Sequence, residues 1–494
     1  MIKIGKSVVK QQQNFWNHCI FHPTDAIEDP WGRRILDRIA EDKAIGTVRI
    51  YSMFEDIVCF DEEGELTYDF RLSDLRLDYL VERGFDILIA YGGIPSILSE
   101  NGGVSTSNSK NKTRYKGKMW NTTPPKDYSL WEQICYEYTK HIVERYGIEA
   151  VSKWRLHCFN EPDIPAFFRA DLGNGESDER IRCEEYCILY SRFERAVRRV
   201  SEDIRIGGPA LALNKGFLAG FLEYVKKNGL KLDYISLHNY GTSPEKLNSG
   251  ERLTVKSIIE HHGEYLEVIK AQGFENTEII VDEWGASSAG FYNVEECPSL
   301  MFREHEVYSA YYVKLIRKMI DFDPNISRLM ICLSGQHEMV EDFSGFRNFF
   351  TLNFIAKPIY NAYILASKLG TGLLHADCDN ENISIVPTKN DKGDIAVLLS
   401  YSSEHFGEDI PDILETVELE DDISDKTVSV WCIDKNTTNP YRLYQKMGID
   451  SPTSEELMTL RNEGKLKPVM RRGSNEPLAL KLTPNCTYLI TVTE

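Results

Sequence analysis

The feature that most constrains the fold is an alternation that repeats eight times over the first two-thirds of the chain. Each short, apolar, β-favouring run is followed by a longer stretch in which apolar residues recur every three or four positions. Repeated strand–helix units are typical of parallel strands joined by crossover helices. The expected strands are Phe15–Ile20, Gly46–Ser52, Asp86–Tyr91, Trp154–Asn160, Arg205–Gly208, Tyr234–His238, Glu278–Glu283 and Ser327–Ser334.

The stretches between these runs have the period of amphipathic helices. The clearest are Leu75–Arg83, Trp131–Tyr146 and Ile258–Gln272. Eight such units over roughly 330 residues predict a (β/α)8 TIM barrel with some long loops. An open doubly wound sheet is the alternative, but its GxGxxG phosphate-binding fingerprint does not follow the first strand.

The pattern changes from about Ala362, where apolar or alternating runs are separated by polar turns. Examples are DIAVLLSYS (394–402), KTVSVWCID (426–434) and CTYLITVTE (486–494). These runs predict an accessory C-terminal β-sandwich domain. We therefore expect residues 1–13 to form a strand that joins the sandwich, 14–350 the catalytic barrel, and 351–494 a linker helix and the sandwich.

Composition excludes several classes of function. The net charge of −19 repels phosphate backbones, so nucleic acid is not an expected partner. The N-terminus lacks the apolar core of a secretory signal, and no run approaches the length of a membrane span. The eleven cysteines show no CxxC spacing, which argues against a zinc site or a disulfide framework and favours a reducing cytoplasm.

Chemistry in a barrel of this kind is carried by the C-terminal ends of the strands. Glu161 follows the fourth expected strand and Glu283 ends the seventh, so the two carboxyls would face each other across the mouth. Such a pair suits glycoside hydrolysis, in which one carboxyl protonates the leaving oxygen and the other attacks the anomeric carbon. Asp282 is the alternative to Glu283, because strand alternation points only one of two neighbours into the mouth.

Other residues near these strand ends complete a sugar site. Asn160 is placed to hydrogen-bond the hydroxyl beside the anomeric carbon, Tyr240 to contact the nucleophile, and His238 to line the pocket. Trp284 and the pair 167–168 offer apolar faces for sugar stacking. Taken alone, Glu161 before a proline is more often a loop residue, and a lone His238 is more often structural. Carboxylates suffice for this chemistry, so no metal or organic cofactor is expected.

An ordered series of segments resembles glycoside hydrolase family 39, which includes β-xylosidases and α-L-iduronidases. The segments include VRIYSMFED (48–56), VERYGIEAVSKWRLHCFNEPD (143–163), ISLHNYG (235–241) and IIVDEWGAS (279–287). The resemblance implies that Glu161 is the acid/base and that Glu283, rather than Asp282, is the nucleophile. It also implies pocket positions for Asn160, His238 and Tyr240, and a β-sandwich beside the barrel.

Two departures from the family concern the sugar pocket. Tyr51 stands near the second-strand arginine, where the family's xylosidases usually carry a histidine. In ICLSGQHEM (331–339), Ile331 replaces a tryptophan, Gly335 an aspartate, and only Glu338 of a glutamate pair is kept. A site built on such groups discriminates strongly by them. Tyr51 and Glu338 are therefore candidate substrate-binding residues in an altered pocket.

These observations predict a cytoplasmic retaining exo-glycosidase that resembles β-xylosidases and acts on short oligosaccharides or glycosides. One alternative keeps the mechanism but changes the sugar, as in an α-L-arabinosidase, a β-galactosidase or a uronidase. Another is a carbohydrate-binding protein without catalysis, although both glutamates are present. The C-terminal domain can bind sugar, support the barrel or contact a second copy, which leaves a homo-oligomer open.

Overall fold

A computed structural model describes residues 1–21, 27, 29–52, 54–99, 121–165, 167–170, 178–288, 290, 292–334, 339, 341–473 and 476–494. Eight parallel strands close into a barrel in the order β10-β11-β2-β3-β6-β7-β8-β9, which confirms the predicted TIM barrel. The strands are β2 (His18–Phe21), β3 (Thr47–Tyr51), β6 (Asp86–Tyr91), β7 (Arg155–Cys158), β8 (Arg205–Leu211), β9 (Tyr234–Tyr240), β10 (Glu278–Gly285) and β11 (Ile326–Leu333).

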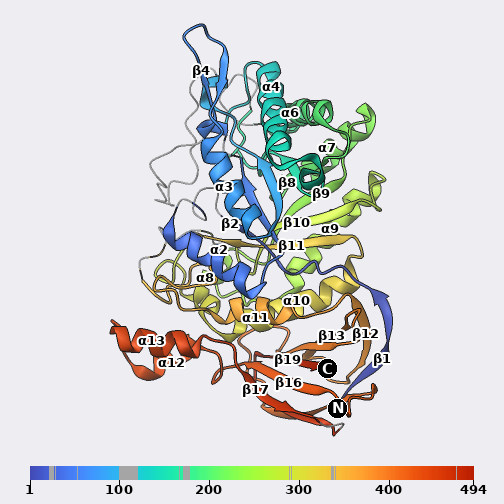
Figure 1. The fold of residues 1–494 in the computed structure, drawn as a ribbon, viewed down its shortest axis with the longest axis vertical. Coiled ribbons are helices and arrows are strands. Elements are labelled where there is room, and N and C mark those ends of the chain that lie inside the picture. Colours follow the sequence, from blue (N-terminus) through green and yellow to red (C-terminus); the bar gives the residue numbers. More distant parts are fainter. Residues whose placement is uncertain are drawn as a thin grey trace.

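Helices follow the strands and cover the outside of the barrel (Figure 1). Capping residues in the sequence mark where helices begin. Asp29 caps α2 by accepting from the Trp31 N–H, and Asn214 caps α7 by accepting from the Phe217 N–H. The helices are α2 (Pro30–Asp42), α3 (Arg71–Glu82), α4 (Tyr128–Tyr146), α5 (Ile148–Val151), α6 (Glu179–Val200), α7 (Lys215–Asn228), α8 (Pro244–Asn248), α9 (Lys256–Ala271) and α10 (Glu306–Phe322).

Short elements lie in the loops between these units. They are the 3-10 helices η1 (Phe54–Asp56), η2 (Ser96–Leu98) and η4 (Pro298–Glu304), and the hairpin strands β4 (Val58–Phe60) and β5 (Leu66–Tyr68).

The N-terminal end of the barrel is closed by an ion-pair network. Arg155 donates to Glu278 at 3.0 Å, and Arg328 pairs with Asp86 at 2.6 Å and with Glu278 at 3.3 Å. A layer of buried apolar side chains fills the barrel next to this network. This end is therefore occupied by packing and structural charge, and the opposite end is left for the site.

The strands beyond the barrel form one nine-stranded sheet in the order β17-β16-β19-β14-β13-β12-β1-β15-β18. We call it the C-terminal sheet. Hydrogen bonds join all nine strands, so the sandwich-like layer arises from one sheet that curls around its own apolar core. Its strands are β1 (Ile2–Gln11), β12 (Gly372–Asp377), β13 (Ile383–Lys389), β14 (Ile395–Tyr401), β15 (Ile413–Leu419), β16 (Thr427–Ile433), β17 (Pro468–Arg472), β18 (Leu478–Leu482) and β19 (Cys486–Thr493).

Strand β1 is central to this sheet, because it pairs antiparallel with β12 and parallel with β15. The chain thus begins in the C-terminal sheet and then enters the barrel, and both termini lie at the same end of the molecule (Figure 1). Helices α10 and α11 (Pro358–Ala366) lie between the barrel and the sheet. Thirteen of the 17 residues of α10 are buried, because the helix is packed on both sides.

A helical hairpin, α12 (Pro440–Met447) and α13 (Ser454–Glu463), is inserted between β16 and β17. Tyr441 and Leu460 pack on Phe343 and Ile355 of the segment that follows β11. The hairpin therefore braces the chain where it leaves the C-terminal end of the barrel. Among the described residues, none of the helices has the length and apolar character needed to cross a membrane.

Candidate active site

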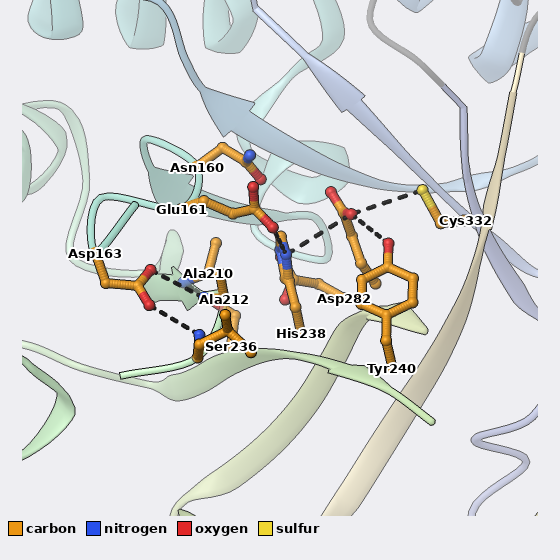
Figure 2. A network of polar contacts seen from close by, with 12 residues as sticks. Asn160, Glu161, Asp163, Ala210, Ala212, Ser236, His238, Tyr240, Asp282 and Cys332 are labelled. Carbon is orange, nitrogen blue, oxygen red and sulfur yellow. Dashed lines mark hydrogen bonds and ion pairs between the residues drawn. The ribbon is translucent and has the colours of Figure 1, made fainter. Parts of the chain in front are cut away.

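Three titratable side chains converge at the C-terminal ends of β7, β9 and β10. One ligand-type atom each from Glu161, His238 and Glu283 lies within 4.8 Å of the other two. Figure 2 shows Glu161 and His238 pointing toward each other, with Tyr240 and Cys332 on the other side of the site. The two glutamates predicted from the strand ends are therefore neighbours in space.

The chain leaves β7 through an unusual turn that aims Glu161 inward. Phe159 has a φ of 65° and Glu161 a φ of 48°, both in the left-handed region that side chains other than glycine rarely adopt. The Glu161 N–H donates to the Ala210 carbonyl at 3.0 Å, and the Phe159 N–H to the Tyr91 carbonyl at 2.7 Å. Bonds to the neighbouring strands thus hold a conformation that costs about 1–3 kcal/mol per residue.

Glu161 has the electrostatic properties of an acid. Burial raises the pKa of Glu161 above its ordinary value, although His238 acts in the opposite direction, and the charge of Glu283 adds to the rise. His238 Nδ1 lies 2.7 Å from Oε1 of Glu161. The imidazole N–H can donate to this oxygen, which leaves the second oxygen to carry a proton toward a ligand.

Glu283 is held as an anion by its surroundings. Arg49 Nη1 donates to Oε1 at 2.7 Å, and the Tyr240 hydroxyl donates to Oε2 at 2.8 Å. Cys332 Sγ lies 3.6 Å from Oε2. Burial alone would raise the pKa of Glu283, but His238 and Arg49 outweigh burial and hold this pKa well below its ordinary value. An ionised, only 8% exposed carboxylate in this place is suited to nucleophilic attack.

Asp282 also faces the barrel interior, although a regular strand would turn only one of two neighbouring side chains inward. The pairing of β10 with β9 shifts register between Val281 and Glu283, a bulge that leaves Asp282 as the extra residue. Asp282 is fully buried and lies 3.2 Å from Arg49 Nη2 and 3.7 Å from His238 Nε2. It has the position of a structural counter-ion beneath the site, whereas Glu283 reaches the mouth.

His238 behaves as a buried cation. Burial disfavours the charged ring, but the carboxylates of Glu283, Asp282 and Glu161 outweigh burial and raise the pKa of His238 to about 10. Arg49 and charged His238 therefore balance Asp282 and Glu283, and Glu161 can stay neutral. The spacing of Glu161, His238 and Glu283 would fit a metal ion, but a protonated imidazole offers no lone pair to one.

Asn160 is oriented by the same arginine. Arg49 Nη2 donates to Asn160 Oδ1 at 2.6 Å, so the amide nitrogen is turned away from Arg49 and is available as a donor in the mouth. Tyr51 lies beside them, with its hydroxyl 3.4 Å from Glu283 Oε1 and its ring under the Arg49 guanidinium. The structure thus brings Asn160, His238, Tyr240 and Tyr51 together around the two glutamates.

Trp284 does not join this group, and the expectation of a stacking face there is wrong. Its ring is fully buried and stacks on Tyr312 of α10 at a centroid distance of 5.8 Å. Strand alternation sends Trp284 outward because Glu283 points inward. Ile331, which pairs with it on β11, is likewise buried in the core. Phe168 is also buried against Phe159.

Gly335 and Glu338 lie outside the described residues, so the role expected for Glu338 stays a prediction. The described part of this region contributes other groups. The thiol of Cys332 lies next to the Glu283 carboxylate. Arg347 donates to the Tyr240 hydroxyl at 3.2 Å and to Ser334 Oγ at 3.2 Å.

Sequence reasoning missed Arg49, Cys332 and Arg347 as parts of the site. Arg49 had a detectable signature, because a charged residue inside a buried strand demands buried partners, and it shares a strand face with Tyr51. Cys332 carries no distinctive pattern. Arg347 lies in a loop, and its approach to Tyr240 depends on tertiary structure.

A barrel that brings together two carboxyls from the ends of β7 and β10, one with a raised pKa and the other with a lowered pKa, defines the class of glycoside hydrolases. Comparisons with known proteins agree. The profile described as "Glycosyl hydrolases family 39" matches residues 1–477. A β-xylosidase of Caldicellulosiruptor saccharolyticus is 26% identical over 462 residues, which cover 90% of this chain and 87% of that protein.

A more distant relative and a solved structure are consistent with this. An α-L-iduronidase of Canis lupus familiaris is 25% identical over 232 residues, which cover 43% of this chain and 30% of that protein. The crystal structure of a monomeric β-xylosidase from Caulobacter crescentus CB15 has the same fold, with a TM-score of 0.83, 18% identity and coverage of 100% and 99%. The chain therefore belongs to glycosyl hydrolase family 39 and is a glycoside hydrolase.

Proposed function

We propose that the chain is a retaining exo-glycosidase in which Glu161 is the acid/base and Glu283 the nucleophile. The observation that carries this proposal is the separation of the two carboxyls, whose facing oxygens lie within 4.8 Å. Retaining enzymes place the two groups roughly 5–5.5 Å apart, whereas inverting enzymes need roughly 6.5–9.5 Å to admit a water. The observed separation therefore supports the retaining arrangement over the inverting one.

In the first step, the proton of Glu161 passes to the glycosidic oxygen as the bond to the anomeric carbon breaks. An oxygen of Glu283 attacks that carbon from the opposite side and forms the glycosyl ester. Arg49 and Tyr240 hold the attacking carboxylate, and the Asn160 amide donates to the neighbouring sugar hydroxyl. His238 keeps its bond to Glu161 Oε1 throughout.

In the second step, Glu161 takes a proton from water, whose oxygen attacks the anomeric carbon. The bond from that carbon to Glu283 breaks, which releases the sugar and restores the Glu283 carboxylate. The change of role follows from electrostatics. The negative charge of Glu283 helps to raise the pKa of Glu161, and this charge disappears when the ester forms. Glu161 then loses its proton more readily and, with His238 as cationic partner, becomes the base.

The relatives named β-xylosidase support a β-xyloside as the first substrate to test. The reaction is assigned to short oligosaccharides or glycosides rather than to a polymer. The cytoplasm is the proposed location, because all eleven cysteines are free thiols, as in a reducing compartment. A homo-oligomer formed through the C-terminal sheet stays a prediction.

A uronidase is the second candidate, and Arg347 is the observation that favours it. Its guanidinium lies against Tyr240, on the nucleophile side of the site, and helps to lower the pKa of Glu283. Guanidinium groups recognise carboxylates by paired hydrogen bonds. A sugar acid bound there would place its carboxylate near a fixed positive charge.

The proposal is tested by substituting each glutamate and measuring hydrolysis of a panel of aryl glycosides and aryl uronides. Glu283→Ala should abolish turnover of every substrate. Glu161→Ala should retain turnover of glycosides with good leaving groups and regain activity with azide, which replaces the missing base. Asp282→Asn should fold and should still hydrolyse the aryl substrates that the wild-type protein hydrolyses. Full activity of either glutamate variant on the preferred substrate would refute the roles.

A further inference from the structure

Asp163, two residues after Glu161, is almost completely buried. Its oxygens accept hydrogen bonds from three consecutive backbone N–H groups of the loop after β8. Ala212 donates to Oδ1 at 3.0 Å, and Leu213 and Asn214 donate to Oδ2 at 2.8 and 2.9 Å. Figure 2 shows Asp163 turned toward Ala212 and away from the carboxyl of Glu161.

These bonds form one half of a clasp between the β7 turn and the β8 loop. The other half runs in the opposite direction, from the Glu161 N–H to the Ala210 carbonyl at 3.0 Å. Ala210 has a φ of 54°, in the left-handed region, and its N–H is held by Ser236 Oγ at 2.8 Å. The clasp therefore fastens two unusual backbone conformations to each other, with Glu161 between them.

We propose that Asp163 is a positioning residue for the acid/base. It holds the Glu161 carboxyl where the carboxyl can protonate the glycosidic oxygen. This inference rests on the proposed function. A left-handed residue such as Glu161 does not keep its conformation unless its surroundings enforce it. A misplacement of about 1 Å can cost about 100-fold in rate, so the clasp matters for catalysis and not only for folding.

Asp163 also acts on Glu161 through its charge. The groups that act electrostatically on Glu161 are His238 on β9, Glu283 on β10, Tyr51 on β3, Tyr240 on β9, Tyr265 on α9 and Asp163 itself. Among them, the negative charge of Asp163 contributes to the raised pKa of Glu161. Removing that charge should let Glu161 lose its proton at lower pH.

The test is a comparison of Asp163→Asn on two substrates of one sugar. Hydrolysis of the phenyl glycoside needs the acid, whereas the dinitrophenyl glycoside has a leaving group that departs without it. We expect kcat/KM on the phenyl glycoside to fall about 10-fold or more and to change about 2-fold or less on the dinitrophenyl glycoside. The alkaline limb of the kcat/KM profile should move to lower pH.

Asp434→Asn is the matched control, because Asp434 is a buried carboxylate in the loop after β16 that accepts a hydrogen bond from the backbone N–H of Asn436. It should reduce thermal stability without changing the ratio of the two substrates. Equal losses on both substrates in Asp163→Asn, or no loss, would overturn the inference while leaving the proposed function intact. A wild-type protein inactive on all glycosides would instead overturn the proposed function.

A second variant covers the case in which Asp163→Asn does not fold. Asp163→Glu keeps the charge and displaces the carboxylate, so it should show the same selective loss on the phenyl glycoside with little change of the alkaline limb. Failure of both variants to fold would assign Asp163 to the fold alone and overturn the positioning role.

Discussion

Removal of the Arg49 guanidinium should move the pH range of activity. Arg49 is fully buried and pairs with Glu283 at 2.7 Å and Asp282 at 3.2 Å. Two unit charges about 4 Å apart interact by about 4 kcal/mol at an effective dielectric constant of about 20, and about 1.4 kcal/mol corresponds to one pKa unit. Since His238 stays in place, we expect Arg49→Met to raise the pKa of Glu283 by about 1–3 units.

The sign of the effect follows from the role of Glu283. A nucleophile must be ionised, and its depressed pKa keeps it ionised into the acidic range. When that pKa rises, activity is lost at a higher pH, so the acidic limb of kcat/KM should move upward. The assay is the pH profile of kcat/KM on an aryl glycoside, which reports groups of the free enzyme.

Stability should change in the same variant. The pKa values of Asp282 and Glu283 are both held below their ordinary values. Their contribution to the free energy of unfolding is therefore present above about pH 4 and is lost as the pH falls through their folded-state pKa values. Arg49→Met should therefore lower the free energy of unfolding by about 3–5 kcal/mol at neutral pH. The loss should be smaller in acid.

Arg328→Met provides the control, since Arg328 pairs with Asp86 and Glu278 at the closed end of the barrel. It should destabilise the protein in a comparable way and leave the acidic limb unchanged. A folded Arg49→Met protein with the wild-type acidic limb would refute the electrostatic account of Glu283.

Three further substitutions separate the roles of neighbouring residues. Tyr240→Phe removes a 2.8 Å hydrogen bond to Glu283. Because a hydrogen bond to a charged group contributes about 1.5–3 kcal/mol, kcat should fall by about 10–100-fold, and an unchanged kcat would contradict this role of Tyr240. Trp284→Ala should lower the free energy of unfolding by about 3–5 kcal/mol, measured by denaturant titration, because the ring is core. Since the pKa of His238 is raised to about 10, its stabilising charge is fully present below about pH 6.5 and is lost toward pH 10. The stability difference between wild type and His238→Gln should therefore shrink over that range, and a constant difference would count against a charged His238.

The barrel was predictable because its pattern is local. Each strand and helix carries its own period, and the order of units then leaves few topologies. The same argument placed Glu161 and Glu283 at strand ends on one face. The C-terminal part was predicted as a sandwich from alternating runs, but periodicity does not say which strands pair. That nine strands form one curled sheet depends on long-range registers such as β1 with β15.

The details of the site were less predictable for a physical reason. The bulge at Asp282 breaks the two-residue period, and a single inserted residue leaves no trace in a run such as EIIVDEWG. Trp284 follows Glu283 and therefore points the other way, an argument that was available from alternation alone. The contacts of Arg49 and Asp163 connect residues far apart in the sequence, so only the folded chain reveals them.

In the proposed mechanism Glu283 forms a covalent bond to the sugar. The most direct measurement is mass spectrometry of the protein after incubation with a 2-deoxy-2-fluoro glycosyl fluoride of the preferred sugar, which slows breakdown of the intermediate. We predict a mass increase of one fluorosugar, mapped by proteolysis to the peptide that contains Glu283 and absent in Glu283→Ala. An adduct on Asp282 or elsewhere, or no adduct in a protein that hydrolyses the parent glycoside, would show that Glu283 is not the nucleophile.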